Sequence, residues 1–423
     1  MYIETTNLLP QKATFRAAEP EFLTRRVDAY YRERVDNVWQ GKHPMKGKIP
    51  GRDAIQLMSN DYLSLSNHPE ILRSQADALV NHGNGMIMSG IFLLNGNNPQ
   101  HAFEQRLAHF MQAEDGILCQ SGWCANTGLI QAIADENTPV YLDMFAHMSL
   151  WEGVLAAGAK AVPFLHNDVQ HLEKQIKNFG PGVVVVDSVY STSGSVCPLM
   201  DLVRVGNQNG CVLVVDESHS LGTHGPNGEG MVAGMGLAAE VHFRTASLAK
   251  AFAGRAGFIT CSTRFADYFK CESRPAIFSS TLLPHEVAGL DATLTIIEKD
   301  KWRRGKLHEN ANYLRTCLDD MGYNLNDSAT QIISLEAGHE RKTIELREAL
   351  EDYGIFGAPF CAPATPKNRS LVRFSVNCDL TRNELDRIIM VCHLIKDKVG
   401  FESWPSTRRK RRPNRNAEMR VAA

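Results

Sequence analysis

The stretch Val212-Leu213-Val214-Val215-Asp216-Glu217-Ser218-His219 predicts a buried β-strand, because its continuous β-branched and apolar run ends at an acid and a turn. Open α/β sheets bind ligands at the carboxyl ends of their strands, and Asp216 lies at that end. A second stretch, Ala246-Ser247-Leu248-Ala249-Lys250-Ala251-Phe252-Ala253-Gly254, sets one lysine among small and apolar residues. Such a lysine is either a surface residue whose aliphatic part packs on the protein while its amine reaches solvent, or a residue whose amine takes part in catalysis.

Asp216, His219 and Lys250 are the kinds of side chain that pyridoxal phosphate (PLP) requires. A lysine carries the cofactor, a carboxylate keeps the pyridine nitrogen protonated, and a third group donates to the ring oxygen. These two stretches alone leave the alternative open, because a strand that ends in aspartate is common in α/β proteins and one lysine proves nothing.

The composition is that of a globular protein with a large core. The chain has 423 residues, of which 43% are hydrophobic and 22% charged, and a net charge of -2, which gives no global attraction to nucleic acid or anionic membrane. We see no signal peptide at Met1-Tyr2-Ile3-Glu4 and no apolar run of about 20 residues that would span a membrane. The ten cysteines form no C-x-x-C pair, which disfavours a metal site and fits a cytoplasmic enzyme.

Repeated strand and helix units predict a parallel sheet with right-handed crossovers. We expect an amphipathic helix from Glu19 to about Trp39, a glycine- and asparagine-rich loop over 83–99, and one long helix from about Pro284 to Lys301 and beyond. A smaller α+β region should follow, with strands Gln331–Glu336 and Ser370–Val376 and helices Arg341–Tyr353 and Thr381–Lys398. The basic tail after Phe401 should be disordered, with no nucleic-acid partner expected.

Four further features have a functional and a structural interpretation. Backbone amides at the helix start Ser121-Gly122-Trp123 would bind phosphate, or Ser121 is an ordinary cap. His147 lies just past a strand, where it would stack on a planar cofactor or be an ordinary structural histidine. Arg373, in the middle of a strand, would hold a carboxylate or face solvent. The hydroxyl-rich loop Phe278–Pro284 would cap a helix or touch phosphate.

Four motifs in order carry a family resemblance: Ser59-Asn60-Asp61-Tyr62-Leu63, Asp216-x-x-His219, Ser247-x-x-Lys250 and the strand arginine Arg373. From about Leu57 to about Lys398 the chain resembles the α-oxoamine synthases, PLP enzymes of the aspartate-aminotransferase fold. The resemblance implies an α/β large domain with a mostly parallel seven-stranded sheet and a smaller α+β domain. It suggests an N-terminal helix and arm over 1–56, the large domain over 57–295, the small domain over 296–400 and the tail over 401–423. It also implies a homodimer with shared active sites.

The resemblance implies a role for each motif residue. Lys250 matches the lysine that carries PLP and acts as general base, Asp216 would pair with the pyridine nitrogen, and His219 would face the ring oxygen together with Ser191. The other implied cofactor contacts are His147 on the ring and Ser121, Gly122, Trp123, Ser247 and, from the neighbouring subunit, Ser280 or Thr281 on the phosphate. The implied substrate contacts are Arg373, Asn60 and Tyr62.

The family joins an amino donor to an acyl-CoA, but the loop Gly83-Asn84-Gly85-Met86-Ile87-Met88-Ser89-Gly90 departs from its glycine-using members. Those members carry an arginine in the corresponding loop, whereas this loop has two methionines, which suit a flexible apolar chain. The chain is similar here to a signal-producing branch that joins a medium-chain acyl-CoA (octanoyl or decanoyl) to S-adenosylmethionine or 2-aminobutyrate. The alternatives are a glycine- or alanine-using biosynthetic member, a plain aminotransferase, and a PLP-sensing DNA-binding regulator.

Overall fold

The computed structural model describes residues 18–94 and 98–408, in two compact units that divide between Lys46 and Gly47. In the first unit, α1 (Glu21–Tyr30) continues as a π-helical segment, η1 (Tyr31–Asp36), so the predicted helix is present but ends a few residues before Trp39. Apolar residues of α1 such as Phe22 and Val27 remain exposed.

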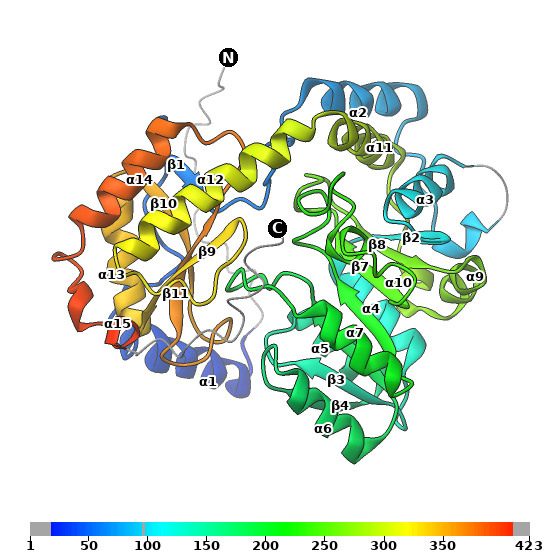
Figure 1. Cartoon of the computed structure of the whole chain (residues 1–423), viewed down its shortest axis with the longest axis horizontal. Coiled ribbons are helices and arrows are strands. Elements are labelled where there is room, and N and C mark those ends of the chain that lie inside the picture. The colour runs from blue at the N-terminus through cyan, green and yellow to red at the C-terminus, as the bar shows by residue number, and fades with distance from the viewer. Residues whose placement is uncertain (1–17, 95–97, 409–423) are drawn as a thin grey trace. The chain divides into compact units, whose positions relative to one another are not determined.

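The second unit contains a seven-stranded sheet, here the large sheet, which lies in the right-hand half of Figure 1. Its strands stand in the order β2, β8, β7, β6, β5, β3, β4, and only β8 runs against the others. The mostly parallel seven-stranded sheet is therefore confirmed. The strand bounds are β2 (Asp115–Cys119), β3 (Pro139–Asp143), β4 (Lys160–Phe164), β5 (Val183–Asp187), β6 (Val212–Asp216), β7 (Phe243–Ser247) and β8 (Gly257–Cys261).

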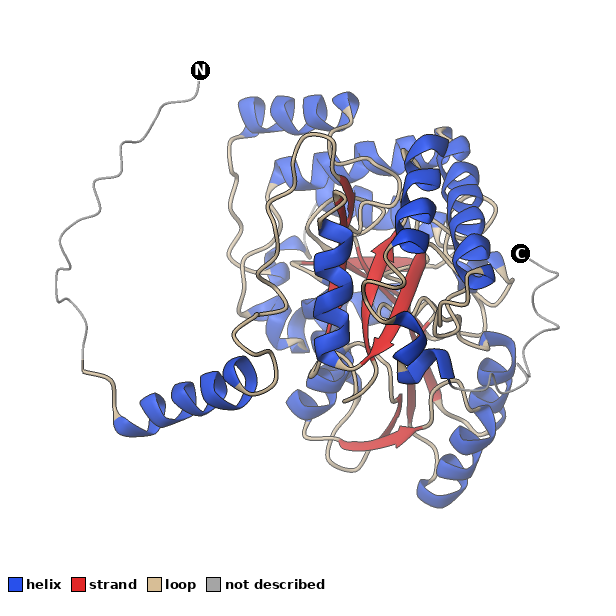
Figure 2. Cartoon of the chain, turned by 90° about the vertical axis from the view of Figure 1, so that its left-hand side faces the viewer, coloured by secondary structure: helices blue, strands red, loops and turns tan. Residues whose placement is uncertain are grey.

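Helices pack on both faces of the large sheet. Figure 2 shows the helices of the chain in blue and its strands in red. Val183 and Val185 of β5 pack with residues of α4 (Gly122–Ile133), α5 (Met148–Ala157) and α9 (Thr263–Glu272). Val184 and Val186 point to the opposite face and pack with α6 (Val169–Phe179) and α7 (Leu199–Gln208). Because successive side chains of a strand alternate between faces, a strand covered on both sides must be apolar throughout, as β5 is before Asp187.

A second, four-stranded sheet, here the small sheet, has the order β1, β10, β11, β9. Its strands are β1 (Ile55–Leu57), β9 (Ile332–Gly338), β10 (Ile355–Phe360) and β11 (Ser370–Ser375), and its helices include α13 (Glu340–Glu351) and α14 (Arg382–Leu394). The predicted strands and helices of this region are confirmed, but the sequence did not predict β10, which contains Gly357 and Pro359. β10 pairs in parallel with β1, so the small sheet joins residues about 300 positions apart in sequence.

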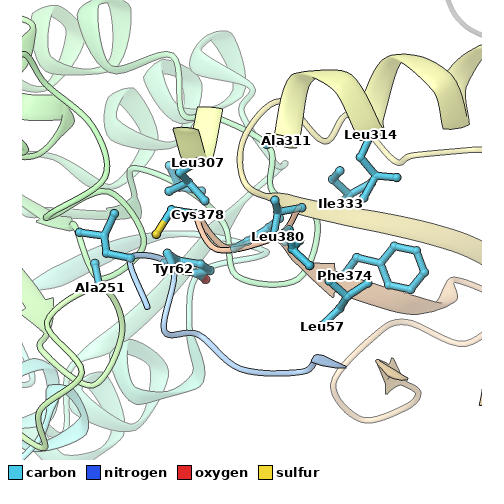
Figure 3. Close-up of a cluster of buried hydrophobic side chains, with 14 of the residues drawn as sticks. Leu57, Tyr62, Ala251, Leu307, Ala311, Leu314, Ile333, Phe374, Cys378 and Leu380 are labelled. Carbon is cyan, nitrogen blue, oxygen red and sulfur yellow. The ribbon is translucent and has the colours of Figure 1, made fainter. Parts of the chain in front are cut away.

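The single long helix predicted from Pro284 is wrong, because the chain leaves the helical conformation at Asp300. The structure has α11 (Pro284–Lys299) and α12 (Lys301–Asp320) instead. Leu307, Ala311 and Leu314 of α12 pack with Ile333 of β9 and Phe374 of β11 in one buried cluster (Figure 3).

The remaining helical segments are short or flank these layers. They are α2 (Pro69–His82), η2 (Gly90–Leu93), α3 (Pro99–Phe110), α8 (Met231–Gly234) and α10 (Arg274–Ile277). The loop predicted over 83–99 thus contains a 3-10 turn at Gly90–Leu93, and residues 95–97 of that prediction lie outside the described residues. Within residues 18–94 and 98–408, no helix combines the length and apolar character that a membrane crossing needs.

The predicted disorder after Phe401 is wrong for its first residues. The chain forms η3 (Phe401–Ser403) and α15 (Pro405–Arg408), because Phe401 and Trp404 pack on Tyr323. The indole Nε1 of Trp404 also donates to the Val399 carbonyl at 3.1 Å. The rest of the predicted tail, residues 409–423, lies outside the described part of the chain.

Trp404→Ala should therefore lower the free energy of unfolding by about 3 kcal/mol or more, since it empties a buried aromatic site. The half-exposed Trp302 is the matched control, and Trp302→Ala should change stability little. Thermal unfolding of both variants measures the difference. Equal melting temperatures for the two variants would contradict the packing of Phe401–Ser406 as part of the core.

Candidate functional site

Polar side chains gather where the parallel strands of the large sheet end. Asp187 and Asp216 are the last residues of β5 and β6 and stand side by side in register. β7 ends nearby at Ser247, three residues before Lys250. The structure thus brings the predicted site residues Asp216, Ser247 and Lys250 to one edge of the sheet, where α/β proteins bind ligands.

Hydrogen bonds hold the Asp216 carboxylate from two sides. The Asn126 amide donates to its Oδ2 at 2.7 Å, and the Ser218 backbone N–H donates to its Oδ1 at 2.8 Å. The same Asn126 amide also donates to the Ser149 hydroxyl, which contacts His147 Nδ1 at 2.8 Å. Sequence reasoning missed Asn126 and Ser149, although Asn126 lies in the first turns of the helix that begins at the predicted Gly122.

Asp187 is a second functional candidate that the sequence did not single out. Burial raises the pKa of its carboxyl well above the ordinary value, and the neighbouring Asp216 raises it further. The backbone N–H of His147 donates to Asp187 at 3.4 Å, and His147 itself remains exposed on one side beside Trp123. Burial and the neighbouring Asp216 thus both favour the neutral form of the Asp187 carboxyl.

The start of α4 forms a tight cradle with β7 and β8. A Cβ on Gly122 would lie 2.5 Å from the Cβ of Ser247, and a Cβ on Gly257 would lie 2.2 Å from the Ser121 carbonyl oxygen. Ser121 caps the helix by accepting from the Cys124 N–H at 3.1 Å. The first amides of a helix have no acceptor within it, so this cradle presents N–H groups to an anion.

Lys250 and His219 share a cationic environment that disfavours their charged forms. Burial lowers the pKa of the Lys250 ammonium, the Arg373 guanidinium lowers it further, and Asp216 opposes both. Burial also holds the pKa of His219 well below its ordinary value, with Lys250 as the next cause. His219 Nδ1 is 2.7 Å from the Tyr62 hydroxyl, and burial raises the pKa of Tyr62 to about 12, so its hydroxyl keeps its proton.

Arg373 is a buried guanidinium with neutral partners. Its side chain donates to the Ser191 carbonyl at 2.6 Å, to the Ser375 hydroxyl at 3.0 Å and to the Asn60 amide oxygen. Among residues 18–94 and 98–408, no Asp or Glu pairs with it, and its Nε has no hydrogen-bond partner. Burial of an unpaired cation is costly, so the site is suited to an anion supplied by a ligand.

Ser280 and Thr281 accept or donate through their backbone groups, and Ser280 contacts the side chain of Gln120, the residue before the cradle. The Gln120 amide donates to the Ser280 carbonyl at 2.9 Å, and the Thr281 backbone N–H donates to the Ile87 carbonyl at 3.1 Å. The second contact joins this segment to the methionine-containing loop. Tyr62, a predicted substrate contact, is fully buried, and its hydroxyl contacts His219 and Asn60.

These residues fit PLP. Gly122 lies against Ser247 with no room for a side chain, Asp216 is a fixed carboxylate, and Lys250 has an amine with a lowered pKa. The family model for class I and II aminotransferases matches residues 52–391.

The chain belongs to the class I and II aminotransferase family.

Two relatives and one solved structure are similar to the chain over most of its length. It is 46% identical to a CAI-1 autoinducer synthase of Vibrio campbellii over 88% of this chain and 94% of that protein. It is 30% identical to an 8-amino-7-oxononanoate synthase of Treponema denticola over 90% of this chain and 98% of that one. A serine palmitoyltransferase of S. paucimobilis, solved with a bound PLP–myriocin aldimine, matches with a TM-score of 0.83 and 27% identity, over 90% of this chain and 99% of that one.

The chain is therefore an enzyme of the PLP-dependent α-oxoamine synthase group within the aminotransferase family, and its cofactor is PLP. The sequence resemblance and the fold expected from it are confirmed.

The buried neutral His219 predicts a pH dependence of stability. The unfolded chain binds a proton on His219 below about pH 6.5, whereas the folded chain does not, so this contribution is complete above that pH and is lost as the pH falls. His219→Gln should reduce the fall in melting temperature between about pH 7.5 and about pH 5.5 relative to the wild type. The exposed His109→Gln is the control. If the melting temperature of both variants fell as much as that of the wild type, this result would contradict the burial of His219 as a neutral ring.

Proposed function

We propose that the enzyme is an acyl-CoA:amino-donor C-acyltransferase that makes an aminoketone precursor of a quorum-sensing autoinducer. Its substrates would be a medium-chain acyl-CoA (octanoyl or decanoyl) and S-adenosylmethionine or 2-aminobutyrate. The observation that carries the proposal is the buried Arg373, which has no acidic partner among the described residues and lies within electrostatic reach of Lys250 and His219. The similarity to the Vibrio campbellii CAI-1 autoinducer synthase supports the choice of product class.

In this proposal the cradle residues bind the phosphate of PLP, and Lys250 holds the cofactor covalently. When bound, PLP supplies an electron sink for the donor Cα. Asp216, fixed by Asn126 and Ser218, would pair with the pyridine nitrogen, while His219 and Ser191 would contact the ring oxygen and His147 would cover the ring. The lowered pKa of Lys250 suits a general base, because a larger fraction of the amine is neutral near neutral pH.

Arg373 would bind the donor carboxylate through its guanidinium, whose Nε has no partner among the described residues, with Asn60 beside it. The donor amine would displace the Lys250 amine from the cofactor, and the freed Lys250 amine would then remove the donor Cα proton. The Cα then forms a bond to the thioester carbonyl carbon of the acyl-CoA, the C–S bond breaks, and CoA leaves as the thiol. Loss of carbon dioxide would complete the aminoketone.

The methionine-containing loop would contact the apolar part of a substrate. Met86 and Met88 are 72% and 75% exposed, so their flexible side chains are available to a ligand. The loop contains no arginine, so no residue in it favours a small, polar donor. We also propose a homodimer in which Ser280 or Thr281 of one protomer reaches the phosphate of its partner.

Thiol release measures the proposed reaction directly. Octanoyl- and decanoyl-CoA should each release CoA when the enzyme is given S-adenosylmethionine or 2-aminobutyrate, and much less with glycine or alanine. Release with glycine or alanine alone would move the enzyme to the biosynthetic branch, to which the 8-amino-7-oxononanoate synthases belong. Release with none of the four donors would contradict the acyltransferase proposal.

Lys250→Ala should prevent covalent attachment of PLP and abolish thiol release, because no other described lysine lies at this strand edge. Borohydride reduction of the holoenzyme followed by peptide mass mapping should find PLP on Lys250 in the wild type and on no lysine in the variant. A labelled lysine elsewhere in the wild type would contradict the assignment.

Arg373→Lys should raise the KM for the amino donor by about tenfold or more, because lysine keeps the charge but loses the planar fork. The KM for the acyl-CoA should change by less than about twofold. Arg369→Lys, at a nearby arginine paired with Glu336, is the matched control and should change neither constant. Equal effects on both substrates would exclude Arg373 as a donor-specific contact.

A further inference from the structure

The loop Ser191–Ser195 is held by residues of the small sheet and of the chain that leads into it. The carbonyl groups of four successive loop residues each accept a hydrogen bond from that side, with donor–acceptor distances of 2.5 to 3.1 Å. The donors are Arg373 to Ser191, Ser334 to Thr192, Ser328 to Ser193, and Ala329 and Thr330 to Gly194. Gly194 has a φ of 71°, and a Cβ there would lie 2.1 Å from the Ile332 carbonyl oxygen, so the loop must approach β9 with bare backbone.

A row of polar side chains holds the same loop from the large sheet. His166, which follows β4, is 2.9 Å from Asp143 through Nδ1 and 3.0 Å from the Ser195 hydroxyl through Nε2. The Ser195 hydroxyl is 2.7 Å from that of Ser193. The next residue, Asn167, donates from its side chain to the Val196 carbonyl at 3.0 Å.

The partners of this row assign its protons. The Asp143 carboxylate accepts, so His166 Nδ1 carries the proton and Nε2 accepts from the Ser195 hydroxyl. The Ser195 oxygen can then accept from Ser193. The His166 ring is fixed in addition by stacking on Phe145, with centroids 4.4 Å apart and planes at 26°. Asp143, His166, Ser195 and Ser193 form one continuous chain of hydrogen bonds, which makes the row a rigid connection between β3, β4 and the loop.

Aspartate, histidine and serine in this order also form the triad of many hydrolases. Here the Ser195 side chain belongs to a residue only 3% exposed, and its oxygen already contacts both His166 and Ser193. A nucleophile must reach a substrate carbonyl, so burial on this scale favours a structural connection over a hydrolytic site.

We infer that His166 is a positioning residue for the amino-donor site. It holds the Ser191–Ser195 loop from the large sheet, so that the Ser191 carbonyl orients the Arg373 guanidinium toward the donor carboxylate. The inference rests on the proposed role of Arg373 in binding that carboxylate. Without His166 the loop would keep its contacts to β9 but lose the side-chain contact that joins Ser195 to Asp143 of the large sheet.

The test compares His166→Ala with His171→Ala in the PLP-loaded enzyme. His171 belongs to the same segment, and its Nδ1 accepts from the Leu165 N–H without touching the loop. In His166→Ala, hydrogen exchange of the Gly194 and Ser195 amides should accelerate by about tenfold, and the Kd for 2-aminobutyrate measured by calorimetry should rise by about tenfold. The KM for the acyl-CoA should stay within about twofold of the wild type, and His171→Ala should change none of the three quantities.

Ser195→Ala provides a second variant with little change in volume, and it should reproduce both effects. The double variant should cost no more donor affinity than either single variant, because the two residues act through one contact. Unchanged loop exchange in His166→Ala, or a loosened loop with unchanged donor affinity, would overturn the inference. Failure of the proposed reaction is a separate result, because it would appear as absent thiol release in the wild type whereas donor binding and loop exchange are measured without acyl-CoA.

Discussion

The buried charge of Arg373 is the constraint on which the rest of the site depends. A guanidinium that is 5% exposed must be solvated by protein, and here three neutral oxygens from three separate segments do so. Asn60 follows β1, Ser191 follows β5, and Ser375 ends β11. The arginine therefore fixes the position of the small sheet relative to the loops at the edge of the large sheet. Because no described acidic residue pairs with Arg373, only a ligand can supply it with a negative charge.

The two sheets contribute different parts of the chemistry. The large sheet fixes Asp216, the Gly122 cradle and Lys250 at its carboxyl edge, and this is the part that fits PLP. The small sheet contributes Arg373 and, through Tyr62 and Asn60, a contact to His219. The proposed acyl transfer requires both parts, because the donor must be held by its carboxylate while its Cα lies near the Lys250 amine. The loop from Ser191 to Ser195 touches both sheets and is the direct path between them.

Local sequence pattern predicted much of this arrangement. The valine-rich runs of β5 and β6 identify strands covered on both faces, and Asp216, His219 and Lys250 were predicted together from short motifs. β10 was missed because Gly357 and Pro359 weaken its local signal, and its pairing with β1 depends on residues about 300 positions away. Asn126, Asp143 and His166 were missed for a related reason. Their roles come from hydrogen bonds to segments distant in sequence, and a single polar residue in a helix or after a strand has no periodicity that would reveal such a contact.

The most direct measurement is a crystal structure of the PLP-loaded enzyme with the amino donor bound. The account predicts that both carboxylate oxygens of the donor lie within hydrogen-bonding distance of the Arg373 guanidinium, with Ser191 still bonded to the same side chain. A donor whose carboxylate lies elsewhere, with Arg373 unchanged among its neutral partners, would contradict the proposed donor site and the positioning role that depends on it.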